Sequence, residues 1–131
     1  MTPTLSARLR RSDKDAGFSL VELLVVVVVI GILAAIAIPM FFRQRERAWM
    51  AAVESDLASA AIAAVGYAAD HDGSYAGLDE AGLLANGYQE SSDVTVTVSA
   101  ATEAAFTLQG THAQIAGTWT FDSDDGGVTG P

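Results

Sequence analysis

The stretch DAGFSLVELLVVVVVIGILAAIAIPMFF, Asp15 to Phe42, decides the fold of this chain. From Phe18 to Phe42 it holds 25 almost wholly apolar residues, with one carboxylate, Glu22, inside them. A helix of that length spans about 37 Å, whereas the hydrocarbon core of a bilayer is about 30 Å thick. The stretch therefore predicts a transmembrane helix.

A buried strand is the alternative, because Val25 to Ile30 is β-branched without a break. Strands in soluble proteins seldom exceed about ten residues. No turn signal interrupts the apolar run before Pro39. Length therefore favours the helix.

Charge is segregated along the 131 residues, whose net charge is −9. The basic residues flank the apolar run: Arg8, Arg10, Arg11 and Lys14 before it, and Arg43, Arg45 and Arg47 after it. Twelve of the sixteen acidic residues follow Arg47, and no Lys or Arg does. An acidic part of this kind repels phosphate backbones, which argues against nucleic acid as a partner, and it favours solubility. The absence of cysteine excludes disulfides and thiol chemistry.

Four segments follow from these patterns. Residues 1–17 are short, polar and basic and form a leader or tail; residues 18–42 form the apolar helix. Residues 43–69 continue the helix as an amphipathic segment, and residues 70–131 form a small acidic head. The apolar stripe of the amphipathic segment is expected at Trp49, Val53, Leu57, Ala61, Val65 and Ala68. Its polar faces are expected at Arg45, Glu46, Glu54, Asp56 and Ser59.

The head is expected to supply the partner for that stripe. The turn formers of Asp70 to Ser74 end the long helix, and Leu78 to Asn86 predicts a short helix closed by Gly87. Three runs with a period of two residues then predict strands: Val94 to Ser99, Ala105 to Gln109 and Thr118 to Phe121. The expected fold class is α+β, with a small antiparallel sheet of about three strands packed against the amphipathic half of the long helix.

The segment KDAGFSLVELLVVVVVIGILAAIAIP, Lys14 to Pro39, resembles the processing signal of type IV pilins and pseudopilins. Its polar residues precede the apolar run, and no small-residue cleavage site follows the run as in a secretory signal peptide. The resemblance implies a pilin-like fold. It also implies that a prepilin peptidase cuts between Gly17 and Phe18 and methylates the new amino terminus of Phe18. The leader would then be Met1 to Gly17.

Three further residues match the family in register: Glu22, Gly31 and Pro39. A charged side chain in a membrane is costly unless it is paired, so Glu22 is expected to meet the terminal amine of a neighbouring copy during assembly. The alternative is that Glu22 merely reaches headgroup water. Gly31 and Ala35 form a weak small-residue pair for close helix approach. In some assembled pilins the segment from Gly to Pro loses helical structure, here Gly31 to Pro39.

The resemblance also implies topology and partners, since the basic residues nearly tie across the apolar run. It places the leader in the cytoplasm, one helix in the inner membrane and the head outside, before assembly into a pilus. The partners would be the prepilin peptidase, an assembly ATPase acting through a membrane platform protein, and other pilin subunits. The expected function is that of a structural subunit, not an enzyme. The alternatives are a pseudopilin of a type II secretion system, or an uncleaved single-pass protein that displays an acidic binding module.

Other candidate sites are weaker, and no cofactor is expected. Asp70, Asp72 and Asp79 overlay part of a calcium loop, but its first ligand position would be Ala68, so a helix-ending turn is preferred. Some pseudopilins bind calcium in a C-terminal loop, and although their fuller motif is not matched, one acidic cluster is a weak candidate. It consists of Asp122, Asp124 and Asp125.

The aromatic and histidine residues add no catalytic signature. His71 and His112 lie far apart and are expected to be ordinary surface or turn residues. Trp49 and Trp119 are expected to anchor the core.

Overall fold

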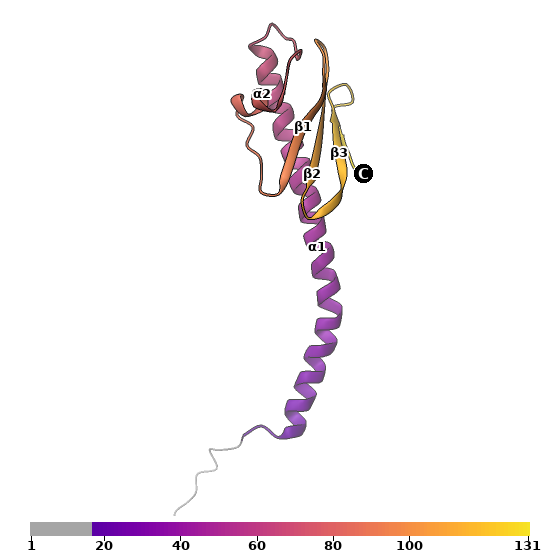
Figure 1. The fold of residues 1–131 in the computed structure, drawn as a ribbon. Coiled ribbons are helices and arrows are strands. Elements are labelled where there is room, and N and C mark those ends of the chain that lie inside the picture. The colour runs from indigo at the N-terminus through magenta and orange to yellow at the C-terminus, as the bar shows by residue number, and fades with distance from the viewer. Residues whose placement is uncertain (1–16) are drawn as a thin grey trace, which may run out of the picture. The chain divides into compact units, whose positions relative to one another are not determined.

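The computed structural model describes residues 17–131, so the predicted leader lies outside the described residues except for Gly17. The chain divides into two compact units, Met1–Pro39 and Met40–Pro131. The elements, in chain order, are α1 (Leu20–Ala69), α2 (Glu80–Ala85), β1 (Val94–Ala101), β2 (Phe106–His112), β3 (Ile115–Asp122) and β4 (Gly127–Thr129) (Figure 1).

Helix α1 matches the predicted long helix and ends where the sequence indicates. It begins at Leu20, directly after Ser19, and its last residue is Ala69. The turn that follows uses left-handed backbone at Asp72 and Gly73, with φ of 56° and 85°. The amide of Gly73 donates a hydrogen bond of 2.7 Å to the carbonyl of Ala68, which closes the helix end.

The head contains one antiparallel sheet of order β1-β2-β3-β4, with α2 near β1. Asp79 caps α2 by accepting a hydrogen bond of 2.8 Å from the amide of Gly82. The predicted α+β class is confirmed, but the sheet has four strands where three were expected. The fourth, β4, is three residues long and pairs with the end of β3 through Val128 and Phe121.

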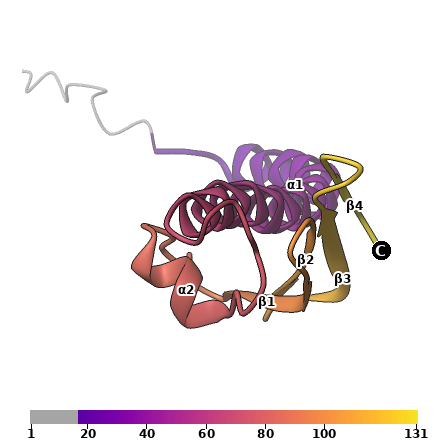
Figure 2. The same cartoon turned by 90° about the horizontal axis from the view of Figure 1, so that it is seen from above.

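The core lies between the second half of α1 and one face of the sheet. The sheet and α2 cover the same side of α1 (Figure 2). Small side chains on the helix, Ala60, Ala61 and Ala64 among them, face large ones on the strands. The helix approaches the sheet closely at Gly110 of β2, where an added Cβ would lie 2.7 Å from Cγ1 of Val53. Glycine therefore lets the helix lie against the sheet backbone at this point.

Two expectations for the helix stripe were wrong. Val65 is exposed, whereas Asp56 is buried. Each step of four residues turns about 40° beyond a full revolution, so Val65 has rotated about 120° away from Val53. Ala64 takes the buried position there. Asp56 is accommodated in the core because its carboxylate is fully hydrogen-bonded, as described below.

The histidine and tryptophan expectations divide in the same way. His71 is exposed, but His112 is 6% exposed and was wrongly expected at the surface. Strand β2 continues through Gly110, and its alternation turns His112 inward with Phe106 and Leu108. Trp119 is buried in the core as expected, while Trp49 is only half-buried.

Candidate assembly site

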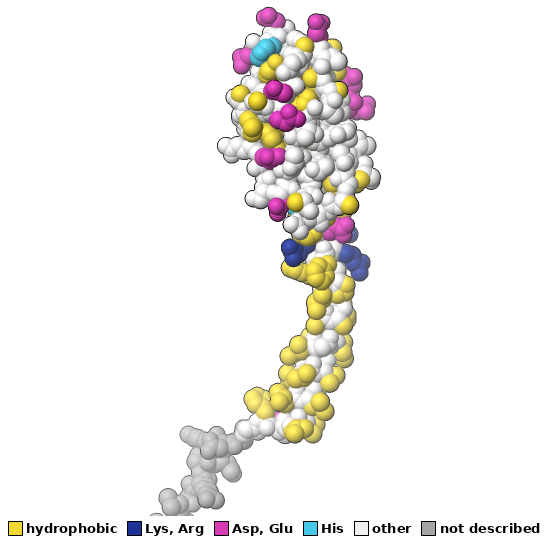
Figure 3. Space-filling view, viewed as in Figure 1, with side chains coloured by type: hydrophobic (Ala, Val, Ile, Leu, Met, Phe, Trp, Pro, Cys, Tyr) yellow, Lys and Arg dark blue, Asp and Glu magenta, His cyan; other side chains and the backbone are white. Residues whose placement is uncertain are grey.

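The first unit presents an uninterrupted apolar surface. Between Leu20 and Ile38 its large hydrophobic side chains are 48–81% exposed. Among the described residues, α1 is the one helix long and apolar enough to cross a membrane, and none of its apolar window is buried. Yellow side chains cover this half of the helix (Figure 3). Such a surface requires lipid or other apolar helices around it.

The amino end of α1 is closed by a reciprocal pair of hydrogen bonds. The amide of Ser19 donates to Oε2 of Glu22 at 2.9 Å, and the amide of Glu22 donates to Oγ of Ser19 at 3.2 Å. This capping box satisfies two amide groups that the helix leaves without partners, and it holds the carboxylate beside the positive end of the helix dipole. Sequence reasoning identified Glu22 and missed Ser19, although the spacing Ser-x-x-Glu is a recognised start signal.

Gly17 and Phe18 lie immediately before this cap. Both are outside the helix and exposed, and the side chain of Phe18 is 90% exposed. The peptide bond between them is therefore open to an enzyme and is not held in helical hydrogen bonding.

Gly31 and Pro39 lie within continuous helix. A Cβ added at Gly31 would meet no atom within 4 Å, so its own chain does not require a glycine there. Pro39 has no amide hydrogen, and the carbonyl four residues earlier, at Ala35, loses its usual donor. The open notch at Gly31 and the weakened turn at Pro39 are features that a neighbouring helix can use.

In the second unit, the buried carboxylate of Asp56 joins α1 to the segment before β1. It accepts hydrogen bonds from the Tyr88 hydroxyl (3.2 Å), the Ser91 amide (2.8 Å) and the Ser91 hydroxyl (2.7 Å). Burial, and then the negative charge of Asp56, raise the pKa of Tyr88 above its ordinary range. The sequence gave no sign of this cluster beyond an acid at a core-facing helical position.

The basic segment, Arg43, Arg45 and Arg47, lies at the start of the second unit. The guanidinium of Arg45 lies over two aromatic rings, 6.0 Å from the centre of Phe41 and 5.0 Å from that of Trp49. The Trp49 ring is 5.6 Å from that of His112, whose Nδ1 accepts a hydrogen bond from the Gln114 amide. Trp49 therefore packs between Arg45 and His112 at the end of β2, which explains why its side chain is half-buried.

The weak calcium candidates form a tight turn between β3 and β4. The side chain of Asp122 accepts a hydrogen bond of 2.9 Å from the Asp124 amide, and its carbonyl accepts one of 2.9 Å from Gly126. In the part of the chain that the structure describes, no three His, Cys, Asp or Glu side chains are grouped to hold a metal ion.

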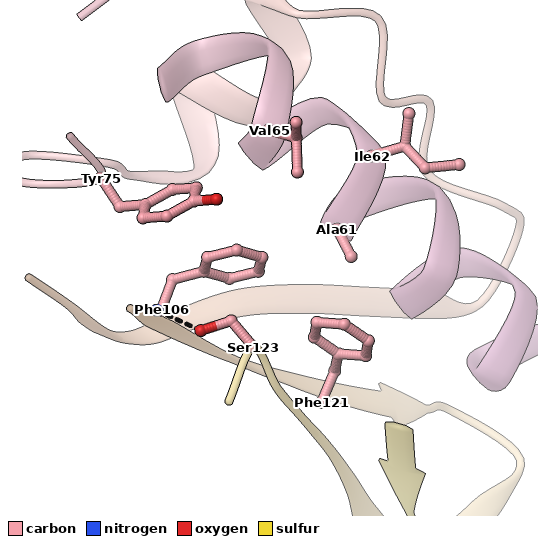
Figure 4. Close-up of a pocket in the computed structure, with 7 residues that line it drawn as sticks. All are labelled: Ala61, Ile62, Val65, Tyr75, Phe106, Phe121 and Ser123. Carbon is pink, nitrogen blue, oxygen red and sulfur yellow. Dashed lines mark hydrogen bonds between the residues drawn. The ribbon is translucent and has the colours of Figure 1, made fainter. Parts of the chain in front are cut away.

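A shallow apolar pocket of about 250 Å³ lies beside α1, toward the carboxyl end of the helix. It is lined by Ala61, Ile62, Val65, Tyr75, Phe106, Phe121 and Ser123 (Figure 4). Ile62 and Val65 stand on the helix at its rim and are 75% and 56% exposed. Only Tyr75 and Ser123 among the lining residues carry polar side-chain atoms, so the pocket lacks the convergent polar groups that fix a small polar ligand.

Comparison with known proteins addresses the first unit most directly. Residues 12–38 match the family described as the prokaryotic N-terminal methylation motif. The chain carries this methylation motif. The resemblance to the processing signal of type IV pilins and pseudopilins is thereby confirmed.

The chain is also similar to the type II secretion system core protein G of Escherichia coli (strain K12). The two are 39% identical over 49 residues, which is 37% of this chain and 34% of that protein. The match thus spans about a third of the relative's length. The methylation motif and this similarity support a pilin-like subunit anchored through an apolar amino-terminal helix.

Proposed function

We propose that this chain is a prepilin-type structural subunit that is cut between Gly17 and Phe18 and polymerises through α1 into a thin filament outside the inner membrane. The observation that carries the proposal is the coincidence of the methylation motif at residues 12–38 with the part of α1 from Leu20 to Ile38, whose large apolar side chains are exposed. An apolar surface of this size is stable in lipid, and again when other subunits replace the lipid.

Before assembly, one helix crosses the membrane with the leader in the cytoplasm and the acidic head outside. The prepilin peptidase removes the leader and methylates Phe18. An assembly ATPase, acting through a platform protein, then supplies the work of lifting the subunit out of the bilayer. Assembly exchanges lipid contacts for helix contacts, and the acidic heads face water.

Glu22 selects the axial register of the polymer. Cleavage creates a cationic amine at Phe18, and an unpaired carboxylate near the bilayer core costs several kcal/mol, of order 3. In parallel helices, the amine of one copy meets Glu22 of the next and offsets both costs. The capping box fixes the carboxylate at the helix end where the amine arrives. Gly31 and Pro39 then let the packed helices approach closely and bend.

A pseudopilin of a type II secretion system is the second candidate. The similarity to core protein G favours it, and its product would be a short filament beneath the outer membrane. A long filament on cells that express this chain as the major subunit would favour the pilus instead.

Mass spectrometry of the membrane-associated protein, from cells with and without the prepilin peptidase, tests the proposal. The expected product begins at N-methylated Phe18 and appears only with the peptidase. A chain that keeps Met1 to Gly17 in both strains would reject processing, and would favour an uncleaved single-pass protein that displays an acidic head.

A further inference from the structure

One face of α1 in the second unit is not covered by the sheet, and it carries charges of both signs. Along this face lie Arg43, Arg47, Glu54, Ala58, Ile62 and Val65, all exposed. At about 100° per residue, Arg47 and Glu54 differ by only about 20° in direction. From the amino to the carboxyl end of this face, the basic side chains come first, the acid Glu54 follows, and the apolar side chains come last.

The spacing prevents these charges from pairing within one helix. Arg47 and Glu54 are seven residues apart, which is about 10.5 Å along the axis. Side chains pair along a helix only at three or four residues, and neither Arg47 nor Glu54 has an opposite charge at that spacing. Arg43 stands three residues from Glu46, but Arg47 has only the like charge of Arg43 at helical spacing, which is a mild conflict.

A second copy, parallel and shifted by two helical turns, resolves the conflict. A shift of seven residues brings Arg47 of one copy level with Glu54 of the next. We propose that this open face of α1 is a docking surface for a second copy of the chain, and that an ion pair between Arg47 and Glu54 of neighbouring copies holds the heads in register. The inference rests on the proposed function. It adds to the Glu22 contact a second contact, between the amphipathic segments of neighbouring copies.

The ion pair sets the axial offset between neighbouring copies. Copies related by a single screw operation share one axial offset. Both residues lie in the second unit, within α1, so an offset of about 10.5 Å brings Arg47 of one copy level with Glu54 of the next.

The apolar part of the face continues the contact. Ile62 and Val65 border the pocket beside Phe121, and a neighbour on this face covers them without burying a further charge. The acidic heads, which carry no Lys or Arg beyond Arg47, would otherwise repel each other. Within residues 17–131, Lys and Arg occur only in the basic segment, and the space-filling view shows these side chains beside the head (Figure 3).

Disulfide trapping in assembled filaments is a direct test, because the chain has no cysteine of its own. The double variant R47C/E54C is expected to give a ladder of covalent multimers on oxidation. Within one helix, the two Cα atoms are about 10.5 Å apart and beyond the limit of about 7 Å for a disulfide. The control R47C/A58C keeps the same face, about 20° on the other side, with an offset of about 16.5 Å, and should stay monomeric.

Charge exchange provides the second measurement. R47E and E54R should each lower the filament yield by about fivefold, and the double variant R47E/E54R should restore it, because the pair is re-formed in the opposite sense. If R47E alone lowers the amount of membrane-bound protein and E54R has no effect, Arg47 contacts lipid headgroups and the inference is overturned.

The outcomes separate this inference from the proposed function. Filaments of chains beginning at N-methylated Phe18 that show no R47C/E54C ladder, or a stronger R47C/A58C ladder, overturn the Arg47–Glu54 contact alone. An unprocessed chain that never polymerises overturns the proposed function itself.

Discussion

The two halves of α1 place their apolar side chains in opposite surroundings. From Leu20 to Ile38 the helix exposes large β-branched and leucine side chains, whereas from Val53 to Ala68 it buries mostly alanine. Burying one large aliphatic side chain is worth about 2 kcal/mol. The first half buries none of these side chains within its own chain and gains this free energy only when lipid or other helices cover it. The second half realises its share within the head. One continuous helix thus derives its stability from the fold at one end and from its surroundings at the other.

The comparison also explains the choice of side chains. Alanine and Gly110 bring the helix close to the sheet, so a small head can exclude water with few residues. The exposed half has no fixed partner in the described chain, and bulky side chains there suit both lipid and the ridges of neighbouring helices. The head therefore tolerates little change of shape, and the apolar half tolerates little change of charge.

The largest effect is expected from removing the charge in the apolar half. Glu22→Gln keeps the capping box, since Gln serves there as well as Glu, but it cannot pair with a cationic amine. We expect normal trimming at Gly17 and a loss of filaments of about a hundredfold, equivalent to about 3 kcal/mol per contact. Sheared filament yield and the mass of the mature chain measure the two effects.

Ser19→Ala is the matched control for that experiment. It removes the cap and keeps the charge, so filament yield should fall far less. Equal losses in both variants would show that capping, and not the register contact, explains the role of Glu22.

In the head, the largest effect is expected at the buried carboxylate. Asp56→Ala leaves the hydroxyl of Tyr88 and both donors of Ser91 without their acceptor, and should lower the free energy of unfolding by about 3 kcal/mol. Thermal unfolding of the full chain in detergent, followed by tryptophan fluorescence, measures this loss. The exposed acid Glu103 is the control, and Glu103→Ala should change stability by less than about 0.5 kcal/mol.

A smaller loss is expected where the helix touches the sheet. Gly110→Ala places a Cβ 2.7 Å from Val53 and 3.1 Å from Leu57, both fully buried. The cost should be about 2 kcal/mol, because neither side chain can move freely. Gly127→Ala adds the same atom where nothing lies within 4 Å, and should leave the melting temperature unchanged. A stable Gly110→Ala head would mean that α1 and the sheet are less closely packed than described.

The smallest effect concerns alkaline pH. The raised pKa of Tyr88 means that the folded head keeps this proton where the unfolded chain, with an ordinary tyrosine near 10, releases it. The stabilisation is therefore complete below pH about 10 and is lost as the pH rises further. Unfolding by urea at pH 9 and 11 should show a steeper loss for the natural chain than for Tyr88→Phe. Parallel losses would assign the alkaline sensitivity to other groups.

Much of this architecture could be predicted from periodicity. The apolar run and the turn after Ala69 follow from the sequence pattern, and three of the strands follow from runs of four to six residues with a period of two. Strand β4 has three residues and one glycine, so no alternation announces it. The predicted strand ended at Gln109, whereas β2 continues through Gly110 to His112 and turns that side chain inward. From the sequence alone, a glycine that lets a helix pack against a strand cannot be distinguished from a glycine that ends the strand.

The candidate site residues also differ in how far the sequence alone could identify them. Gly17, Phe18, Glu22, Gly31 and Pro39 stand in one short segment, where the resemblance to the pilin processing signal identifies them, and their roles are proposals. The Asp56 cluster joins residues more than thirty positions apart, and no local pattern reports that kind of pairing. The open face of α1 required the exposure of individual side chains, which only the packed head defines.

The place where α1 begins also sets a limit on proteolysis. An endopeptidase binds its substrate as an extended strand, and an α-helix must unwind before its backbone can be gripped. Because Ser19 and Glu22 hold the first turn closed, the backbone of α1 from Leu20 is held in helical hydrogen bonding, while Gly17 and Phe18 lie outside the helix. Under the proposed processing, the cap sets how far the peptidase can advance and therefore the length of the helix that is left.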